Sequence, residues 1–240
     1  MERDTPFCCA VVVAAGESSR MGLDGTKQLL RLLGVPVLLR TLRAFQAASR
    51  IQEIVVVCRQ EDLPKIEPFS REISKICAIV SGGQTRQSSV WNGIAAVSAR
   101  ARYLAIQDGA RPLVRPEAIN RVVEDACRFG VSVLSTPVKD TIKISGENGM
   151  VVQTPERRAL RAVQTPQVFC RELYEQAADY ARRCGGDYTD DCQLAEQAGI
   201  PVHLCDGDAT NLKITTPEDL VIAEAILRSW GEEYADRTWI

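Results

Sequence analysis

Short aliphatic runs rich in β-branched residues recur along the chain, and their apolar residues do not alternate with polar ones. Runs of this kind are typical of strands buried on both faces of a parallel sheet. Between them lie stretches whose apolar residues recur at helical spacing. The pattern predicts strands at residues 8–14, 53–58, 76–80, 103–107, 131–136 and 202–205, and helices at 37–48, 88–99, 116–129, 173–183, 190–198 and 217–229. This alternation predicts an α/β fold with a doubly wound, mostly parallel sheet.

One segment, residues 140–164, breaks the alternation. A turn signal at 146–149 separates two short apolar runs at 142–144 and 150–152, which predicts a protruding hairpin. An arm of this size buries little of itself, so we expect it to pack on a second subunit. No repeat, low-complexity tract or linker interrupts the rest, so residues 1–240 are predicted to form one domain with a dimerisation arm at about 140–164.

Charge and hydropathy narrow the functional classes. The 31 acidic and 29 basic residues nearly cancel, to a net charge of -2. This balance argues against nucleic-acid binding, which normally needs a basic excess. The apolar run at 7–16 is too short to span a bilayer, and residues 1–6 hold two acids where a signal peptide carries positive charge. We therefore expect a cytoplasmic protein that does not enter a membrane.

The cysteines and the single histidine exclude two further kinds of site. Nine cysteines are an odd number for a disulfide framework, and most have aliphatic neighbours, so we expect reduced thiols that fill the core. Cys8, Cys9, Cys58 and Cys77 have such neighbours. One histidine, His203, cannot supply a His-rich metal site and is a poor candidate for a Ser-His-Asp triad.

The loop after the first predicted strand is a candidate anion site. Ligands of open parallel sheets bind beyond the carboxyl ends of the strands. Here the strand is followed by Gly16, Ser18, Ser19 and Arg20, with Lys27 a little further on. Backbone N–H groups and cations in such a loop suit a phosphate. The sequence is neither GxGxxG nor GxxxxGK[ST], which disfavours dinucleotide and P-loop ATPase sites, and a solvated turn with two surface cations is an equal alternative.

Two further strand ends carry polar loops. The segment SGGQTRQSSV at 81–90 places glycines before a helix, although Ser88 or Ser89 could simply cap that helix. In QDGARP at 107–112, Asp108 closes a strand and Arg111 follows three residues later. A carboxylate at this position suits a hydroxyl group or Mg²⁺, and the alternative is a structural ion pair between Asp108 and Arg111.

The polar loops together match one known family. The motifs AAGESSRMG with KQ, SGGQTRQSSV, QDGARP, VKDTIK, QTPQVF, TDD and NLKITTPEDL stand in order along nearly the whole chain. This set resembles the 2-C-methyl-D-erythritol 4-phosphate cytidylyltransferases of the non-mevalonate isoprenoid pathway. The resemblance implies a Rossmann-like nucleotidyltransferase fold and transfer of CMP from CTP to 2-C-methyl-D-erythritol 4-phosphate. It also implies a requirement for a divalent cation such as Mg²⁺ and a homodimer built partly through the arm.

The same resemblance implies roles for individual residues. Arg20 and Lys27 would stabilise the charge of the transition state, and Arg157 and Lys213 would align the acceptor, with Arg157 reaching in from the partner's arm. Asp108 would lie where ribose, metal and acceptor meet, and would be the metal ligand. The further nucleotide contacts implied are Ala14, Ala15, Gly16, Gly83, Ser89 and Gly109, and the further acceptor contacts are Arg111, Thr141, Thr165 and Thr189.

The chain also departs from the family pattern at a few positions. Ser18 stands where glycine is frequent and Thr26 where proline often precedes the lysine, while Val13 and Lys139 replace proline and arginine. These changes leave the shape of the first loop open. Alternative functions are a cytidylyltransferase acting on ribitol or ribulose 5-phosphate, a nucleotidyltransferase using UTP or GTP, and a non-catalytic module that only binds CTP.

Overall fold

A seven-stranded sheet forms the centre of the computed structural model, which describes residues 6–16, 26–186 and 188–231. Six of the strands are parallel, so the predicted doubly wound, mostly parallel α/β fold is confirmed. The strand order is β11-β7-β10-β6-β1-β4-β5. The strands are β1 (Cys8–Val13), β4 (Glu53–Cys58), β5 (Ile76–Ser81), β6 (Tyr103–Asp108), β7 (Val131–Pro137), β10 (Arg161–Cys170) and β11 (His203–Asp206).

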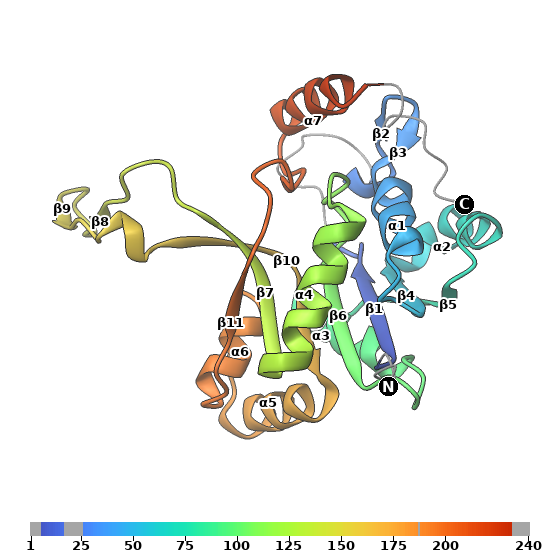
Figure 1. Ribbon diagram of the computed structural model, residues 1–240, viewed down its shortest axis with the longest axis horizontal. Helices are drawn as coiled ribbons and strands as arrows, with labels where there is room; N and C mark the ends of the chain where they lie inside the picture. The colour runs from blue at the N-terminus through green and yellow to red at the C-terminus, as the bar shows by residue number, and fades with distance from the viewer. Residues whose placement is uncertain (1–5, 17–25, 187, 232–240) are drawn as a thin grey trace.

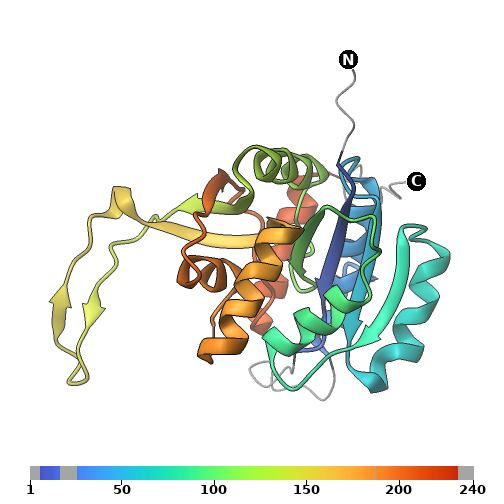
Figure 2. The ribbon, with the colours of Figure 1, turned by 90° about the horizontal axis from the view of Figure 1, so that it is seen from below.

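Helices cover both faces of this sheet (Figure 2). The central strand β1 shows why its sequence lacks alternation: Ala10 and Val12 pack with α1 and α4, whereas Val11 packs with α3, α5 and α6 on the other face. Both sets are fully buried. The helices are α1 (Val37–Ala47), α2 (Leu63–Ile66), α3 (Arg86–Ala95), α4 (Pro116–Phe129), α5 (Arg171–Cys184), α6 (Asp191–Gln197) and α7 (Pro217–Ser229). None of the helices in the described part of the chain is long and apolar enough to cross a membrane.

Strand β10 was not predicted. It runs antiparallel between β6 and β7, and its first residue, Arg161, pairs with Pro137. The last residues of the predicted arm therefore belong to the central sheet. The polar residues and Pro166 of β10 interrupt the run of aliphatic residues from which the other strands were predicted. The β7–β10 pairing is irregular between Val163 and Gln167, and this irregularity accommodates a proline, which cannot donate to the ladder.

The arm projects well beyond the body of the molecule (Figure 1). Its tip is the hairpin of β8 (Ile144–Ser145) and β9 (Val151–Gln153), and the short 3-10 helix η5 (Arg157–Ala159) follows on the return path. The arm exposes several large apolar side chains, with Met150 and Val152 at 66% and 70% exposure. Within the described part of a single chain, these side chains do not pack into a hydrophobic core.

The core residues on the two faces of the sheet form two hydrophobic clusters, and a third cluster holds the loops at one end of the sheet. Helix α7 packs here with the small hairpin of β2 (Arg31–Leu32) and β3 (Val35–Pro36). Ala110 and Leu113 from the loop after β6 join the same cluster, together with Ile214. The backbone N–H of Ile214 donates to Ala110 O at 2.8 Å. The segment that carries Lys213 is thereby attached to the end of β6.

The cysteines and the histidine largely follow expectation. All nine cysteines lie in the described part of the chain and none is in a disulfide. Cys8, Cys9 and Cys58 are buried as predicted, but Cys77 is exposed because β5 is an edge strand, and Cys127 on α4 and Cys184 on α5 are exposed as well. His203 lies on β11 near the opposite edge, where it stacks on Phe129 and its Nδ1 lies 2.5 Å from Asp125 Oδ2.

Candidate active site

A cavity of about 690 Å³ opens at the carboxyl ends of the central strands. The chain passes from β1 to β4 and β5 on one side and then returns to β6 on the other, so ligands are expected where β1 and β6 diverge. Val13 and Asp108 face each other there as register partners. Among the residues expected from the sequence, those that line the cavity are Ala15, Gly16, Gly83, Ser89, Asp108 and Lys213.

Ala14 and Gly109 directly follow β1 and β6 but are not among the residues that line this cavity. Ala14 is fully buried, and its N–H donates to Val57 O at 2.6 Å. Gly109 donates to Val13 O at 2.8 Å, and a Cβ at Gly109 would lie 3.0 Å from that same oxygen. Glycine therefore allows the loop after β6 to pack directly against the end of β1.

The second glycine loop is held by its own hydroxyl groups. Thr85 caps α3 through a reciprocal pair of hydrogen bonds with Ser88. Ser89 is buried, and its hydroxyl accepts from Gly83 N at 3.0 Å and donates to Thr85 O at 2.9 Å. A Cβ at Gly82 would lie 2.4 Å from the Cβ of Ala15, so the loops after β1 and β5 pack against each other. Ser89 thus lines the cavity and orders the loop, but it does not cap α3, because Thr85 is the N-cap and Ser88 is its partner in the reciprocal pair.

Asp108 gathers cations from separate segments. Its Oδ2 lies 2.9 Å from Lys213 Nζ and 3.6 Å from Arg111 Nε, while its Oδ1 lies 3.9 Å from Arg86 Nε. Burial alone would raise the pKa of this carboxyl, but Lys213, Arg111 and Arg86 together outweigh burial and hold the pKa below its ordinary value. Asp108 is therefore ionised at neutral pH, and the cations are held close together at the cavity.

Hydrogen bonds hold Arg111 and Thr165 in place around Asp108. Asp108 donates its N–H to Thr165 Oγ1 at 3.1 Å, and Arg111 Nη1 donates to Asn211 O at 2.7 Å. Buried Asn211 donates to Thr165 O at 3.0 Å. Burial lowers the pKa of Arg111, although Asp108 opposes that shift. The structure thus brings Asp108, Arg111, Thr165 and Lys213 together from three distant parts of the sequence.

One ion pair at the cavity was missed from sequence. Arg86 lines the cavity, and its Nη1 lies 2.7 Å from Asp191 Oδ2 at the start of α6. Tyr174 also donates to Asp191, at 2.9 Å. Arg86 belongs to the motif SGGQTRQSSV and Asp191 to TDD. Their place in these two motifs was the sequence signal that could have indicated a role at the site. Thr189, two residues before Asp191, is exposed and donates to Gln193 Oε1 at 3.0 Å.

Two expected residues, Thr141 and Arg157, do not line the cavity of a single chain, and the structure does not describe the side chains of two others, Arg20 and Lys27. Thr141 and Arg157 are exposed on the arm, and Arg157 Nη1 donates to Lys139 O at 3.1 Å. Arg20 lies outside the described residues, as does Ser18. Lys27 begins the 3-10 helix η2 (Lys27–Leu29), and its side chain is not described.

Thr26, which replaces a frequent family proline, is part of a buried polar network. Its hydroxyl donates to Asp62 at the end of η3 (Gln60–Asp62) and accepts from Arg59. Asp62 is fully buried, and its other oxygen accepts from Lys65 Nζ at 3.1 Å. Leu29 donates its N–H to Thr26 O at 2.9 Å. This network fixes the backbone immediately before Lys27.

The network predicts an acid-sensitive contribution to stability. Burial opposes ionisation of Asp62, but hydrogen bonds from Thr26, Arg59 and Lys65 hold its pKa below the ordinary value of about 4. Stability from a lowered pKa is present above about pH 4 and is lost as the pH falls further. In urea unfolding, Asp62→Asn is expected to cost about 1–3 kcal/mol at pH 7 and progressively less toward pH 3.

Glu67→Gln is the matched control, because Glu67 is an exposed acid at the start of the nearby 3-10 helix η4 (Glu67–Arg71) and is not a partner of Asp62. We expect it to change the free energy of unfolding by less than about 0.5 kcal/mol at every pH. A deficit in Asp62→Asn that stays constant from pH 7 to pH 3 would contradict the proposed ionised network.

Comparison with known proteins assigns the family. The family model of 2-C-methyl-D-erythritol 4-phosphate cytidylyltransferase matches residues 8–229. A protein of that name from Pelotomaculum thermopropionicum is 43% identical over 223 residues, covering 92% of this chain and 94% of its own length. One from Caldanaerobacter subterraneus subsp. tengcongensis is 44% identical over 222 residues, covering 91% and 98%.

Solved structures agree with this assignment. The crystal structure of 4-diphosphocytidyl-2C-methyl-D-erythritol synthase from Anaerococcus prevotii superposes with a TM-score of 0.85 at 29% identity, covering 94% of this chain and 97% of that one. That of 2-C-methyl-D-erythritol 4-phosphate cytidylyltransferase from Thermus thermophilus gives 0.75 at 37% identity, covering 91% and 98%. The chain therefore belongs to the 2-C-methyl-D-erythritol 4-phosphate cytidylyltransferase family.

Proposed function

We propose that this chain transfers CMP from CTP to 2-C-methyl-D-erythritol 4-phosphate, giving 4-diphosphocytidyl-2-C-methyl-D-erythritol and pyrophosphate in the non-mevalonate route to isoprenoid precursors. The observation that carries this proposal is the cavity at the switch point, where Asp108 gathers Lys213, Arg111 and Arg86 in a chain of this family. The use of CTP also supports a cytoplasmic location.

The reaction needs charge stabilisation more than proton transfer. A phosphate oxygen of the acceptor attacks the α-phosphorus of CTP, and the bond from that phosphorus to the bridging oxygen breaks to release pyrophosphate. The attacking oxygen is already ionised, so no general base is required. Preorganised cations lower the barrier by offsetting repulsion between two anions and the charge that grows on the leaving oxygen. This role falls to Arg20 and Lys27, and Lys213 and Arg157 align the attacking phosphate.

The nucleotide lies along the two packed glycine loops. Ala14, Ala15 and Gly16 follow β1. Among the described residues, no atom lies within 4 Å of a hypothetical Cβ on exposed Gly16, which suits close approach of a ligand to its backbone. Gly83 and Ser89 receive the cytosine and ribose end from the second loop. The backbone N–H groups of such loops suit the phosphates of a nucleoside triphosphate.

Asp108 also suits a divalent cation. Mg²⁺ is usually held by one or two carboxylates together with substrate phosphates, and Asp108 supplies a hard oxygen whose ionised form is favoured. Its Oδ1 is the better candidate ligand, because Lys213 and Arg111 both approach Oδ2. When bound, the ion neutralises phosphate charge and polarises the phosphoryl oxygens.

The acceptor is expected on the side of Asp108 that faces Arg111 and Thr165. Gly109 keeps that side of the loop close to β1, and exposed Thr189, two residues before Asp191, is a further acceptor contact expected from the family motif TDD. Thr141 and Arg157 complete the acceptor pocket only if an arm reaches it. The exposed apolar side chains of the arm at 140–164 support a homodimer in which each arm serves the partner's site.

Acceptor and nucleotide specificity distinguish the alternative functions. Pyrophosphate release is expected with CTP and 2-C-methyl-D-erythritol 4-phosphate, with kcat/KM well above that for ribitol or ribulose 5-phosphate. Replacing CTP with UTP or GTP is expected to abolish it. Faster turnover of a pentose phosphate, or CTP binding without pyrophosphate release from any acceptor, would refute the proposal.

Mixed dimers test whether Arg157 acts across subunits. Arg157→Ala and Lys213→Ala are each expected to lower kcat about 10²–10³-fold. If Arg157 serves the partner's site, a hybrid of the two variants contains one site with both native residues. Random 1:1 mixing makes about half of the dimers hybrid, so about a quarter of wild-type activity should return. No recovery on co-expression, with hybrid dimers verified by differential tags, would show that Arg157 acts within its own chain or not at all.

A further inference from the structure

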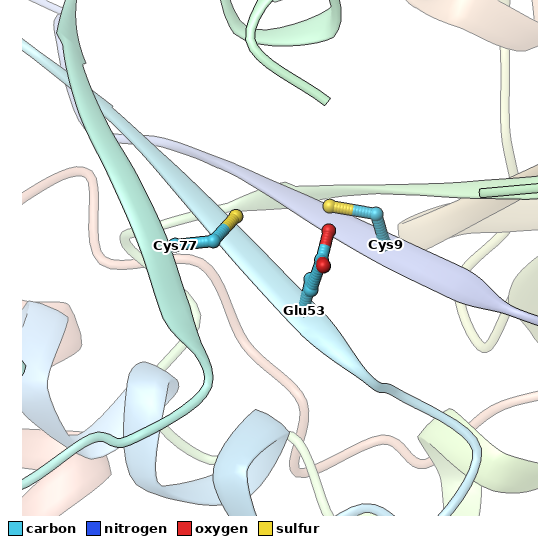
Figure 3. A group of neighbouring side chains, drawn as sticks. All are labelled: Cys9, Glu53 and Cys77. Atoms are coloured by element: carbon cyan, nitrogen blue, oxygen red, sulfur yellow. The ribbon is translucent and has the colours of Figure 1, made fainter. Parts of the chain in front are cut away.

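Three side chains that the transfer reaction does not use converge near the amino ends of the central strands. Cys9 on β1, Glu53 on β4 and Cys77 on β5 turn toward one shared space (Figure 3). The two sulfur atoms and a Glu53 carboxylate oxygen all lie within 4.8 Å of one another. Cys9 and Glu53 are register partners, which places their side chains next to each other on the same face.

Cys77 reaches this face because β5 is irregular at that point. Ile54 pairs with Ile76, but the next residue, Val55, pairs with Ala78. Cys77 is therefore an extra residue opposite the Ile54–Val55 step, and a bulge of this kind re-aims a side chain. Cys77 Sγ lies 3.4 Å from Ile54 O, which keeps the thiol beside β4.

Among the described residues, no cation forms an ion pair with the carboxylate of Glu53. Glu53 Oε2 is buried and has no hydrogen-bond partner in the described structure. Leaving a buried acceptor unsatisfied costs about 1–3 kcal/mol, and more for a charged group. A cation among the three groups would supply the partner that Glu53 Oε2 lacks.

A disulfide between the two cysteines does not fit the sheet. β1 and β5 are separated by β4, so their Cα traces lie about 9.6 Å apart at two interstrand spacings. Cysteines whose Cα atoms are more than about 7 Å apart cannot be bridged without moving the backbone. A metal ion spans such a gap, because each ligand needs to reach only the shared centre.

We propose that Cys9, Glu53 and Cys77 form a binding site for a thiophilic divalent cation of the zinc type. Two thiolates and one carboxylate suit Zn²⁺, and a fourth position on the side of exposed Cys77 can take water. Tetrahedral ligands at about 2.3 Å from an ion lie about 3.8 Å apart, so these donors need to close by about 1 Å at most. Binding releases the two thiol protons to solvent.

The position of the site indicates a structural or regulatory role. Cys9 precedes Val13 by four residues on β1, which separates the cluster from the catalytic cavity by about 13 Å. The ion would instead join the edge strand β5 to β4 and β1. Occupancy of the site is therefore expected to change the stability of this edge of the sheet rather than the transfer step.

Cobalt provides a direct spectroscopic test. The full-length protein, stripped with a chelator and reduced, is titrated with Co²⁺ alone. We expect a thiolate-to-cobalt charge-transfer band that saturates at one ion per chain and disappears when Zn²⁺ is added. Cys77→Ser is expected to lose most of the band, whereas Cys184→Ser, which removes an exposed cysteine on α5 outside the cluster, keeps it in full.

Glu53→Gln tests the carboxylate separately. It retains the size of the side chain, and we expect it to weaken Co²⁺ and Zn²⁺ binding by about 10-fold or more while the charge-transfer band persists at saturation. Zn²⁺ should raise the thermal midpoint of the wild-type protein but not that of Cys77→Ser. No charge-transfer band in the wild-type protein, or a band of equal intensity and affinity in Cys77→Ser, would overturn the assignment.

Discussion

The ion cluster around Asp108 is the interaction on which the candidate active site depends. A buried carboxylate is tolerated only when charges and hydrogen bonds compensate it, and Asp108 obtains this from Lys213, Arg111 and Arg86. The dependence is mutual, because these cations would repel one another across the cavity without a shared anion. A chain with a net charge of -2 can therefore present a locally positive site to two phosphorylated ligands. The near-zero net charge argues against a broad basic face on the protein surface, but it does not determine the charge inside a single cavity.

The fold places this cluster by simple rules of parallel sheets. Asp108 ends β6 beside Val13 at the end of β1, so both strands deliver their following loops to one point. Gly109 and Gly82 let those loops pack closely, and the third hydrophobic cluster holds the segment of Lys213 against the loop after β6. Local packing thus fixes the positions of charges that are more than one hundred residues apart in the sequence.

Sequence reasoning succeeded where the signal was local. The aliphatic runs located β1, β4, β5 and β6 to within one residue, because strands of a sheet covered by helices on both faces are rich in aliphatic residues. It failed for β10, whose proline and polar residues lie at an irregularity that only the neighbouring strands reveal. The Arg86–Asp191 pair was also missed, since its members come from α3 and α6 and no local pattern links them. Exposed Cys77 was misjudged because position at the sheet edge is a tertiary property.

The most direct test of this account is a double-mutant cycle on kcat/KM with Asp108→Asn and Lys213→Gln. If the carboxylate acts largely by holding the lysine, removing Asp108 should cost much less in the Lys213→Gln protein than in the wild type. Coupling between residues in one such network is typically about 0.5–3 kcal/mol, and we expect a value in the upper part of that range. If each substitution lowers kcat/KM by the same factor whether or not the other is present, Asp108 does not organise the site.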